Sequence, residues 1–210
     1  MSTAARPDRL PGGRSLATEL SARIDEALQA HLGSPPHEAG TLLVAASGGL
    51  DSGVLTHVLR FGLRPRPEVV LAHFDHAMRP SSASDTHWLR GVARAWGLEA
   101  RTARAAHAPA SEDAARQARY AFLERVRAEV GARWILTAHH ADDQAETVLF
   151  RILRGTGLVG LRGMDAVRET ARDADGSAAI VRPLLDLRRD ELAAYPAAVV
   201  LRWRQDPTNL

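Results

Sequence analysis

The chain has 210 residues, 45% hydrophobic and 25% charged, with a formal net charge of +2, no Cys and no Lys. The missing Cys excludes disulfides, zinc–thiolate sites, iron–sulfur clusters and Cys nucleophiles within these residues, and the missing Lys excludes a Walker-A loop and an internal Schiff base. No apolar run reaches the roughly 20 residues of a membrane span, and the polar N-terminus is unlike a secretory signal, so we expect a cytoplasmic protein with no membrane partner.

Residues 1–15 are polar, which predicts a flexible arm ahead of a domain at 16–210. Beyond the arm, amphipathic helical spacing alternates with short apolar runs. In chain order the pattern predicts helix 16–32, strand 41–46, helix 51–61, strand 69–74, helix 84–96, strand 98–102, helix 111–130, strand 134–138, helix 142–154, strand 179–185 and helix 188–195. Ser111 and Gly131 are expected to cap and end one helix, the polar stretch 168–177 to be a mobile loop, and Pro196 to interrupt the last helix.

This alternation predicts an α/β fold, a doubly wound, mostly parallel five-stranded sheet with helices on both faces. The strands are continuous apolar runs, as expected of strands buried on both sides. Ligands bind such sheets at the carboxyl ends of the strands. Candidate site residues are therefore sought at 47–52, 74–80, 138–146 and 182–186.

A glycine-rich loop, 47–53, follows the first strand and opens a helix. Its glycines allow a tight turn, and the helix N-terminus offers free N–H groups and a positive dipole to an anion. Ser47 and Ser52 add hydroxyl donors. Asp51 would repel phosphate, unless a Mg²⁺ ion bridges the carboxylate and the phosphate oxygens. The loop therefore predicts a phosphate site with Asp51 as a metal ligand.

A second polar stretch, 139–147, follows the fourth strand and also opens a helix. Helical spacing predicts a core face formed by Ala145, Val148, Leu149 and Ile152. Asp143 and Glu146 share another face, where two carboxylates suit a cationic substrate or a metal. His139 and His140 could donate hydrogen bonds or move a proton. A zinc site is disfavoured because adjacent His side chains on a strand diverge.

These residues carry a family resemblance over roughly 40–209. Residues 47–52, Ser-Gly-Gly-Leu-Asp-Ser, resemble the SGGxDS loop of the ATP pyrophosphatase (PP-loop) superfamily, with its adenine nucleotide alpha hydrolase-like fold. Residues 139–147 resemble the HHxDDQxET signature of tRNA(Ile)-lysidine synthases. Further motifs match in order at 73–79, 115–120, 154–164, 182–185 and 203–209.

The resemblance implies a ligase that uses ATP to adenylate the C2 oxygen of the wobble cytidine in the isoleucine tRNA with a CAU anticodon. The ε-amine of free L-lysine then displaces AMP and forms lysidine. The implied ATP and Mg²⁺ contacts are Ser47, Gly48, Gly49, Leu50, Asp51 and Ser52, with Asp75 and His76 at the adenosine. The implied substrate contacts are Arg116, Arg119, Asp143 and Glu146, and the implied catalytic residues are Asp51, His139 and His140.

Two departures and two alternatives accompany this interpretation. Pro196 falls where the family continues its helix, and the family continues past residue 210 with tRNA-binding domains. The sequence therefore predicts a catalytic domain that binds ATP without efficient tRNA modification by itself. The alternatives are another PP-loop tRNA-modifying enzyme, such as a thiolase, which the missing Cys disfavours, or a non-catalytic nucleotide- or tRNA-binding remnant.

Overall fold

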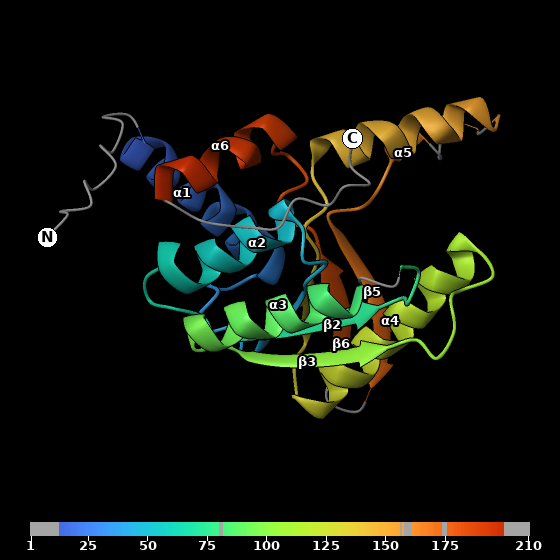
Figure 1. Ribbon diagram of the computed structural model, residues 1–210. Helices are drawn as coiled ribbons and strands as arrows, with labels where there is room; N and C mark the ends of the chain where they lie inside the picture. The colour runs from blue at the N-terminus through green and yellow to red at the C-terminus, as the bar shows by residue number, and fades with distance from the viewer. Residues whose placement is uncertain (1–12, 80–81, 156, 158–160, 174–175, 200–210) are drawn as a thin grey trace, which may run out of the picture.

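A computed structural model describes residues 13–79, 82–155, 157, 161–173 and 176–199 (Figure 1). At its centre lies a six-stranded sheet in the order β3-β2-β1-β4-β6-β5. The strands are β1 (Leu42–Ala45), β2 (Val69–Asp75), β3 (Glu99–Arg104), β4 (Trp134–Leu136), β5 (Val167–Asp173) and β6 (Gly176–Val181). Five of them run parallel, which confirms the predicted α/β class.

The edge strand β5 corrects two predictions. It pairs antiparallel with β6, so the sheet has six strands instead of five, and residues 168–173, predicted as part of a mobile loop, belong to a paired strand. The strand has few apolar residues, and an edge strand needs few because backbone hydrogen bonds to one neighbour hold it. The predicted strand 179–185 is β6, which begins at Gly176 and ends at Val181, before Pro183.

Within the described residues, six α-helices connect or flank the strands: α1 (Gly13–Leu32), α2 (Leu50–His57), α3 (Ser82–Trp96), α4 (Glu112–Glu129), α5 (Ala141–Leu153) and α6 (Arg189–Val199). A π-helical turn, Val58–Gly62, extends α2. The Ser111 side chain accepts the N–H of Ala114, which confirms the predicted cap. Helix α1 begins inside the segment predicted as an arm. Among the described helices, none has an apolar stretch long enough to cross a membrane.

Two apolar clusters cover the two faces of the sheet. Helices α1, α2, α3 and α6 contribute to the larger cluster, around Val44, Leu71 and Leu136. Helix α4 covers the other face with Phe122, Leu123 and Val126. Alternate residues of β1, β2, β4 and β6 therefore enter different clusters, which explains why these four strands are continuously apolar.

Helix α5 contradicts the core face predicted for it. None of its residues is buried, and Leu149 and Ile152 are 56% and 51% exposed. Figure 1 shows α5 projecting away from the sheet. The apolar residues of α5 do lie on one face of the helix, as predicted, but no described element covers that face. The helix is held at its N-terminal end and through Gln144 and Arg151.

Pro196 does not interrupt α6, contrary to the prediction. The helix continues to Val199, with Leu192, Tyr195 and Pro196 buried. It lies against α1 and α2, and burial of these apolar side chains offsets the hydrogen bond that proline cannot donate.

Candidate active site

The strand order reverses between β1 and β4, which are hydrogen-bonded neighbours. From β1 the chain moves outward through β2 and β3, and then returns on the other side of β1. Open α/β sheets bind ligands at such a switch point. A cavity of about 160 Å³ lies there, and its lining comes from the loop after β1, the end of β4, and α4. The lining residues are Ala45, Ser47, Asp51, Ser52, Arg119, Tyr120, Leu123, Thr137, Ala138 and His139.

The loop after β1 is held by its own serines. The Ser47 and Ser52 hydroxyl oxygens are 3.0 Å apart, the Gly49 N–H donates to Ser47 Oγ over 3.2 Å, and Ser52 Oγ donates to the Gly49 carbonyl over 3.1 Å. Gly48 has a φ of +88°, a conformation that favours glycine. The predicted phosphate loop is thus a compact turn, and it carries both hydroxyls beside the N-terminus of α2.

The N-terminus of α2 lacks a side-chain cap, because its cap residue is Gly49. By contrast, Ser111 caps α4 and His140 caps α5. The N–H groups and the positive dipole end of α2 therefore remain available for an anion. Leu50 begins this helix and packs partly against the larger apolar cluster.

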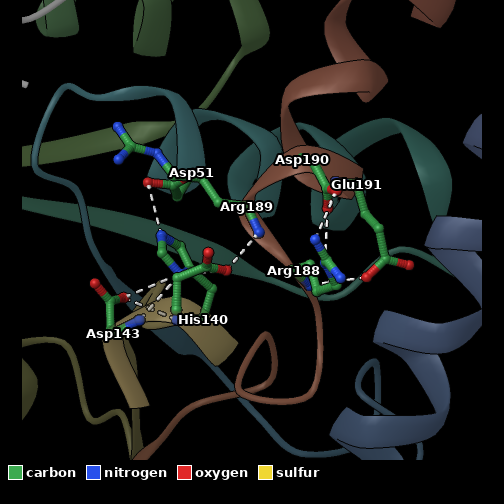
Figure 2. Close-up of polar contacts among 8 residues, drawn as sticks. Asp51, His140, Asp143, Arg188, Arg189, Asp190 and Glu191 are labelled. Carbon is green, nitrogen blue, oxygen red and sulfur yellow. Dashed lines mark hydrogen bonds and ion pairs between the residues drawn. The ribbon is translucent and has the colours of Figure 1, made fainter. Parts of the chain in front are cut away.

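Asp51 lies in the first turn of α2 and faces His140 (Figure 2). Its Oδ2 is 3.7 Å from His140 Nε2, and its Oδ1 is buried without a hydrogen-bond partner. Burial raises the pKa of the Asp51 carboxyl, against the opposing effect of His140. A buried carboxylate oxygen with no donor is suited to a metal ion.

His140 forms a reciprocal cap with Asp143. The His140 N–H donates to Asp143 Oδ2 over 2.9 Å, and the Asp143 N–H donates to His140 Nδ1 over 3.4 Å. Because Nδ1 accepts a hydrogen bond, the proton of the neutral ring belongs on Nε2, the nitrogen that faces Asp51. The cap thus fixes both the position and the tautomer of the imidazole.

Asp142 joins the start of α5 to the start of α6. Its Oδ2 accepts the N–H of Arg189 over 2.9 Å, and the Ala141 N–H donates to the Leu187 carbonyl over 2.8 Å. The Arg189 hydrogen bond lowers the pKa of Asp142. Asp142 therefore helps to hold α5 and α6 together through its hydrogen bond to the Arg189 N–H.

His139 points into the cavity at the switch point. Its Nδ1 lies 2.9 Å from Thr137 Oγ1. Burial, and then the nearby charge of Arg182, lower the pKa of His139 to about 4. The ring is consequently neutral at pH 7 and can accept a hydrogen bond in the cavity.

Arg116 and Arg119 lie one turn apart on α4, above the Tyr120 ring. Their guanidinium carbons are 5.3 and 5.4 Å from the ring centre. Arg119 lines the cavity, whereas Arg116 is exposed beside it. A third guanidinium, that of Arg168 on β5, lies 5.1 Å from the same ring. The sequence indicated the first two but gave no signal for Arg168, since 168–177 was expected to be a loop.

Asp75 and His76 follow β2. Asp75 is buried, accepts the N–H of Ala77 over 2.8 Å, and lies 3.5 Å from Arg104 Nε. It lines a second cavity of about 320 Å³ beside α3 and β3, away from the phosphate loop. His76 Nδ1 is buried without a hydrogen-bond partner, and burial lowers the pKa of this ring. The structure therefore places Asp75 beside a cavity different from the one that holds Asp51 and His139.

The two acids predicted to hold a cationic substrate differ in their surroundings. Asp143 is partly buried and bonded to the His140 N–H, whereas Glu146 is exposed one turn further along α5. Among the described residues, no group of three or more His, Asp or Glu side chains comes together as a ready metal site.

Gln144 has a role that the sequence did not reveal. Its Nε2 donates to the Met164 carbonyl over 2.9 Å, and its Oε1 accepts the Met164 N–H over 2.6 Å. This pair of bonds mimics a strand pairing and attaches α5 to the segment before β5. Both residues belong to motifs matched in the sequence, at 139–147 and 154–164, but only the structure shows that their side chain and backbone are in contact.

The PP-loop domain family matches residues 16–210. The chain is 43% identical over 176 residues to the tRNA(Ile)-lysidine synthase of Thermus thermophilus, covering 80% of this chain and 32% of that protein. It is 40% identical to the Pseudomonas aeruginosa enzyme of that name, covering 92% and 42% respectively. The chain thus spans between about a third and a half of these relatives.

Solved structures share the fold at low sequence identity. The U34-tRNA thiolase NcsA from Methanococcus maripaludis, solved with its 4Fe-4S cluster, matches with a TM-score of 0.70 and 15% identity, covering 90% of this chain and 67% of that one. An NH3-dependent NAD synthetase from Campylobacter jejuni matches with a TM-score of 0.51 and 16% identity, covering 90% and 74%. Together with the match over residues 16–210, the loop after β1 and the switch-point cavity show that the chain belongs to the PP-loop domain family.

Proposed function

We propose that the domain holds the catalytic site for an ATP-dependent ligation of free L-lysine to C2 of the wobble cytidine of an isoleucine tRNA, a reaction that it is expected to perform inefficiently by itself. The observation that carries this proposal is the uncapped N-terminus of α2 with Asp51, which opens onto the same cavity as His139 and Arg119. The relatives named tRNA(Ile)-lysidine synthase support the choice of substrates. The cytoplasm remains the expected compartment.

In this proposal the phosphates of ATP lie on the loop after β1. The α2 N–H groups and the Ser47 and Ser52 hydroxyls bind phosphate oxygens. Mg²⁺ fits here because Asp51 Oδ1 is buried and lacks a donor. The ion would neutralise charge on the phosphates during adenylation.

The reaction would proceed in two displacements. The cytidine C2 oxygen bonds to the α-phosphorus of ATP, and pyrophosphate leaves. The lysine ε-nitrogen, once deprotonated, then bonds to C2, and AMP leaves. His139 contributes a neutral imidazole to the cavity, able to accept a hydrogen bond, and His140 holds a proton on Nε2 toward Asp51. Asp75 lines the separate cavity beside α3 and β3, so only the family resemblance supports its assignment, together with His76, to the nucleoside.

The lysine side chain is assigned to Asp143 and Glu146. Glu146 is the exposed member of the pair, so its charge can be removed without loss of the α5 cap. An ammonium group needs carboxylates to replace its hydration, which an apolar pocket cannot supply. Glu146 is therefore the residue to test.

The experiment separates the two displacements. Pyrophosphate release with the isoleucine tRNA transcript reports adenylation, and lysine-dependent AMP release reports ligation. Glu146→Gln should raise the lysine concentration for half-maximal AMP release about tenfold, by loss of a charged hydrogen bond, with pyrophosphate release unchanged. Glu26→Gln, an exposed change on α1, is the matched control. Pyrophosphate release that needs no tRNA, or AMP release indifferent to lysine, would reject the proposal.

A thiolase function is the alternative raised by the NcsA structure. A 4Fe-4S cluster is held by Cys thiolates, and these 210 residues contain no Cys. The fold likeness therefore does not extend to that cluster chemistry within this chain.

A further inference from the structure

Four arginines from three parts of the chain gather around Tyr120. Arg116 and Arg119 come from α4 and Arg168 from β5, and their guanidinium carbons lie 5.1 to 5.4 Å from the ring centre. Figure 1 shows the β5 end of the sheet beside α4. Arg182, which follows β6, is 3% exposed and donates to the Asp165 carbonyl, and its Nε has no hydrogen-bond partner. We call this group the Tyr120 arginine cluster.

The cluster carries positive charge that no acidic side chain compensates. Among the described residues, none of its four arginines forms an ion pair. Elsewhere arginines are paired with carboxylates, for example Arg104 with Asp75 and Arg125 with Glu129. Burying Arg182 beside other guanidinium groups is costly unless an anion binds, since like charges disfavour one another. The arrangement therefore indicates an anionic ligand.

The cluster extends from the cavity to the outer surface. Arg119 and Tyr120 line the cavity together with Ser47 and Asp51, whereas Arg116 and Arg168 are exposed. ATP has its own phosphate site at the uncapped α2 N-terminus. A single carboxylate, such as that of an amino acid, needs one guanidinium and would leave the exposed ones unused. A track of arginines leading out of a cavity suits a polymer with repeated negative charges.

We propose that the Tyr120 arginine cluster binds backbone phosphodiesters of the RNA strand next to the nucleotide that enters the cavity. This inference rests on the proposed tRNA substrate and assigns it a surface on α4 and the β5–β6 hairpin. Guanidinium groups bind phosphate oxygens in pairs and also stack on splayed bases. The Tyr120 ring, with three guanidinium groups around it, holds them in place.

The test compares Arg116→Gln and Arg168→Gln with Arg125→Gln. Arg125 is the matched control because it is exposed on the same helix, lies 5.6 Å from the Phe122 ring, and is already paired with Glu129. The probes are a stem-loop RNA with the CAU anticodon and, separately, Mg·ATP. Affinities are measured by fluorescence anisotropy for the RNA and by calorimetry for ATP, over a series of salt concentrations.

Each cluster variant should lower RNA affinity about tenfold and reduce the slope of log affinity against log salt by about 0.7 to 0.9, the value for one lost phosphate contact. Arg125→Gln should change neither quantity, and ATP affinity should stay the same in all three variants. A loss of ATP affinity with RNA binding intact would assign the cluster to the triphosphate and overturn the proposal. Wild-type protein that binds ATP but not RNA would also overturn it.

The ligase proposal can fail independently. Cluster-dependent RNA binding without lysine-dependent AMP release would leave the interface standing and reject the ligation. Lysine-dependent AMP release that is unaffected by Arg116→Gln and Arg168→Gln would support the ligation and reject the RNA interface.

Discussion

The Nε2 atom of His140 lies 3.7 Å from Asp51 Oδ2, so one imidazole links the phosphate loop to the start of α5. The same ring accepts the Asp143 N–H at Nδ1. A residue that caps a helix is thereby also a neighbour of the metal-binding candidate. The two roles make different demands on the side chain, and substitutions can separate them.

His140→Asn should keep the cap and lose the contact with Asp51. Asparagine is a good N-cap, so the free energy of unfolding should stay close to wild type, whereas His140→Ala should lose about 1 kcal/mol. Both variants should slow tRNA-dependent pyrophosphate release, by about a hundredfold if the imidazole takes part in proton transfer. Denaturant unfolding and the release assay measure the two effects.

Ser111→Ala is the control for the cap, because Ser111 caps α4 away from Asp51. It should lower stability by a similar amount and leave turnover per folded molecule unchanged. Full activity in His140→Asn would show that His140 serves only as a cap.

Asp51→Asn should stabilise the nucleotide-free protein while abolishing its use of Mg·ATP. Because burial raises the pKa of Asp51 in the folded state, the folded protein holds this proton more tightly than the unfolded chain. The group's contribution to stability therefore falls as pH rises through that window, and at pH 7 the buried charge is a full penalty. An amide of the same shape removes it.

Thermal unfolding at pH 7, with and without Mg·ATP, tests this prediction. A gain of 1 kcal/mol would raise Tm by about 2 to 4 °C in a domain of this size, and Mg·ATP should no longer raise it further. Asp186→Asn, at an exposed position, should change neither value. A lower Tm for nucleotide-free Asp51→Asn would contradict the account.

Because of His139, the free energy of unfolding should decrease as the pH is lowered from about 6.5 to about 4. Its folded-state pKa is lowered to about 4, so in this interval the unfolded chain binds a proton that the folded protein does not. Stability therefore rises with pH across the interval and levels off above it. A shift of this size in one histidine pKa changes the free energy of unfolding by about 3 kcal/mol across the whole interval.

His139→Gln should flatten that dependence. The measurement is the difference in unfolding free energy between wild type and variant at pH 4.5 and at pH 7, which cancels the contributions of the other buried histidines. His107→Gln, at an exposed site, is the control. An equal difference at both pH values would mean that the ring is not buried as the structure has it.

The apolar strands and the glycine-rich loop after β1 could be predicted because their causes are local. The run at Leu42–Ala45 is apolar on both faces because both faces are covered, and Ser111 precedes a helix that it caps. The loop at 47–52 shows its chemistry in its residues: glycines, hydroxyls and one acid beside a helix N-terminus.

What could not be predicted depends on partners distant in the sequence. Strand β5 has little apolar character, and only its pairing with β6 makes it a strand. The spacing of Leu149 and Ile152 indicates an apolar face but cannot tell whether anything covers it. Arg168 reaches Tyr120 only because of that missed strand, and Gln144 meets Met164 across 20 residues.

Gly163→Ala should detach α5 from the segment that precedes β5. Gly163 has a φ of +69°, and a Cβ there would lie 2.5 Å from Gln144 Oε1, so the side chain that bonds Met164 would have to move. No residue of α5 is buried, so the helix depends on such links and can open without global unfolding. Amide hydrogen exchange of α5 should accelerate about tenfold, the equivalent of about 1.4 kcal/mol, with a much smaller change in global stability.

Gln144→Ala should produce the same acceleration, and the double variant should add little, because both changes break one link. Gly157→Ala is the control, since a Cβ at this nearby glycine meets nothing within 4 Å. Additive effects would place the two residues in separate interactions. If exchange of α5 were unchanged in all variants, another contact, such as the one from Arg151 to the Gly163 carbonyl, would have to hold the helix.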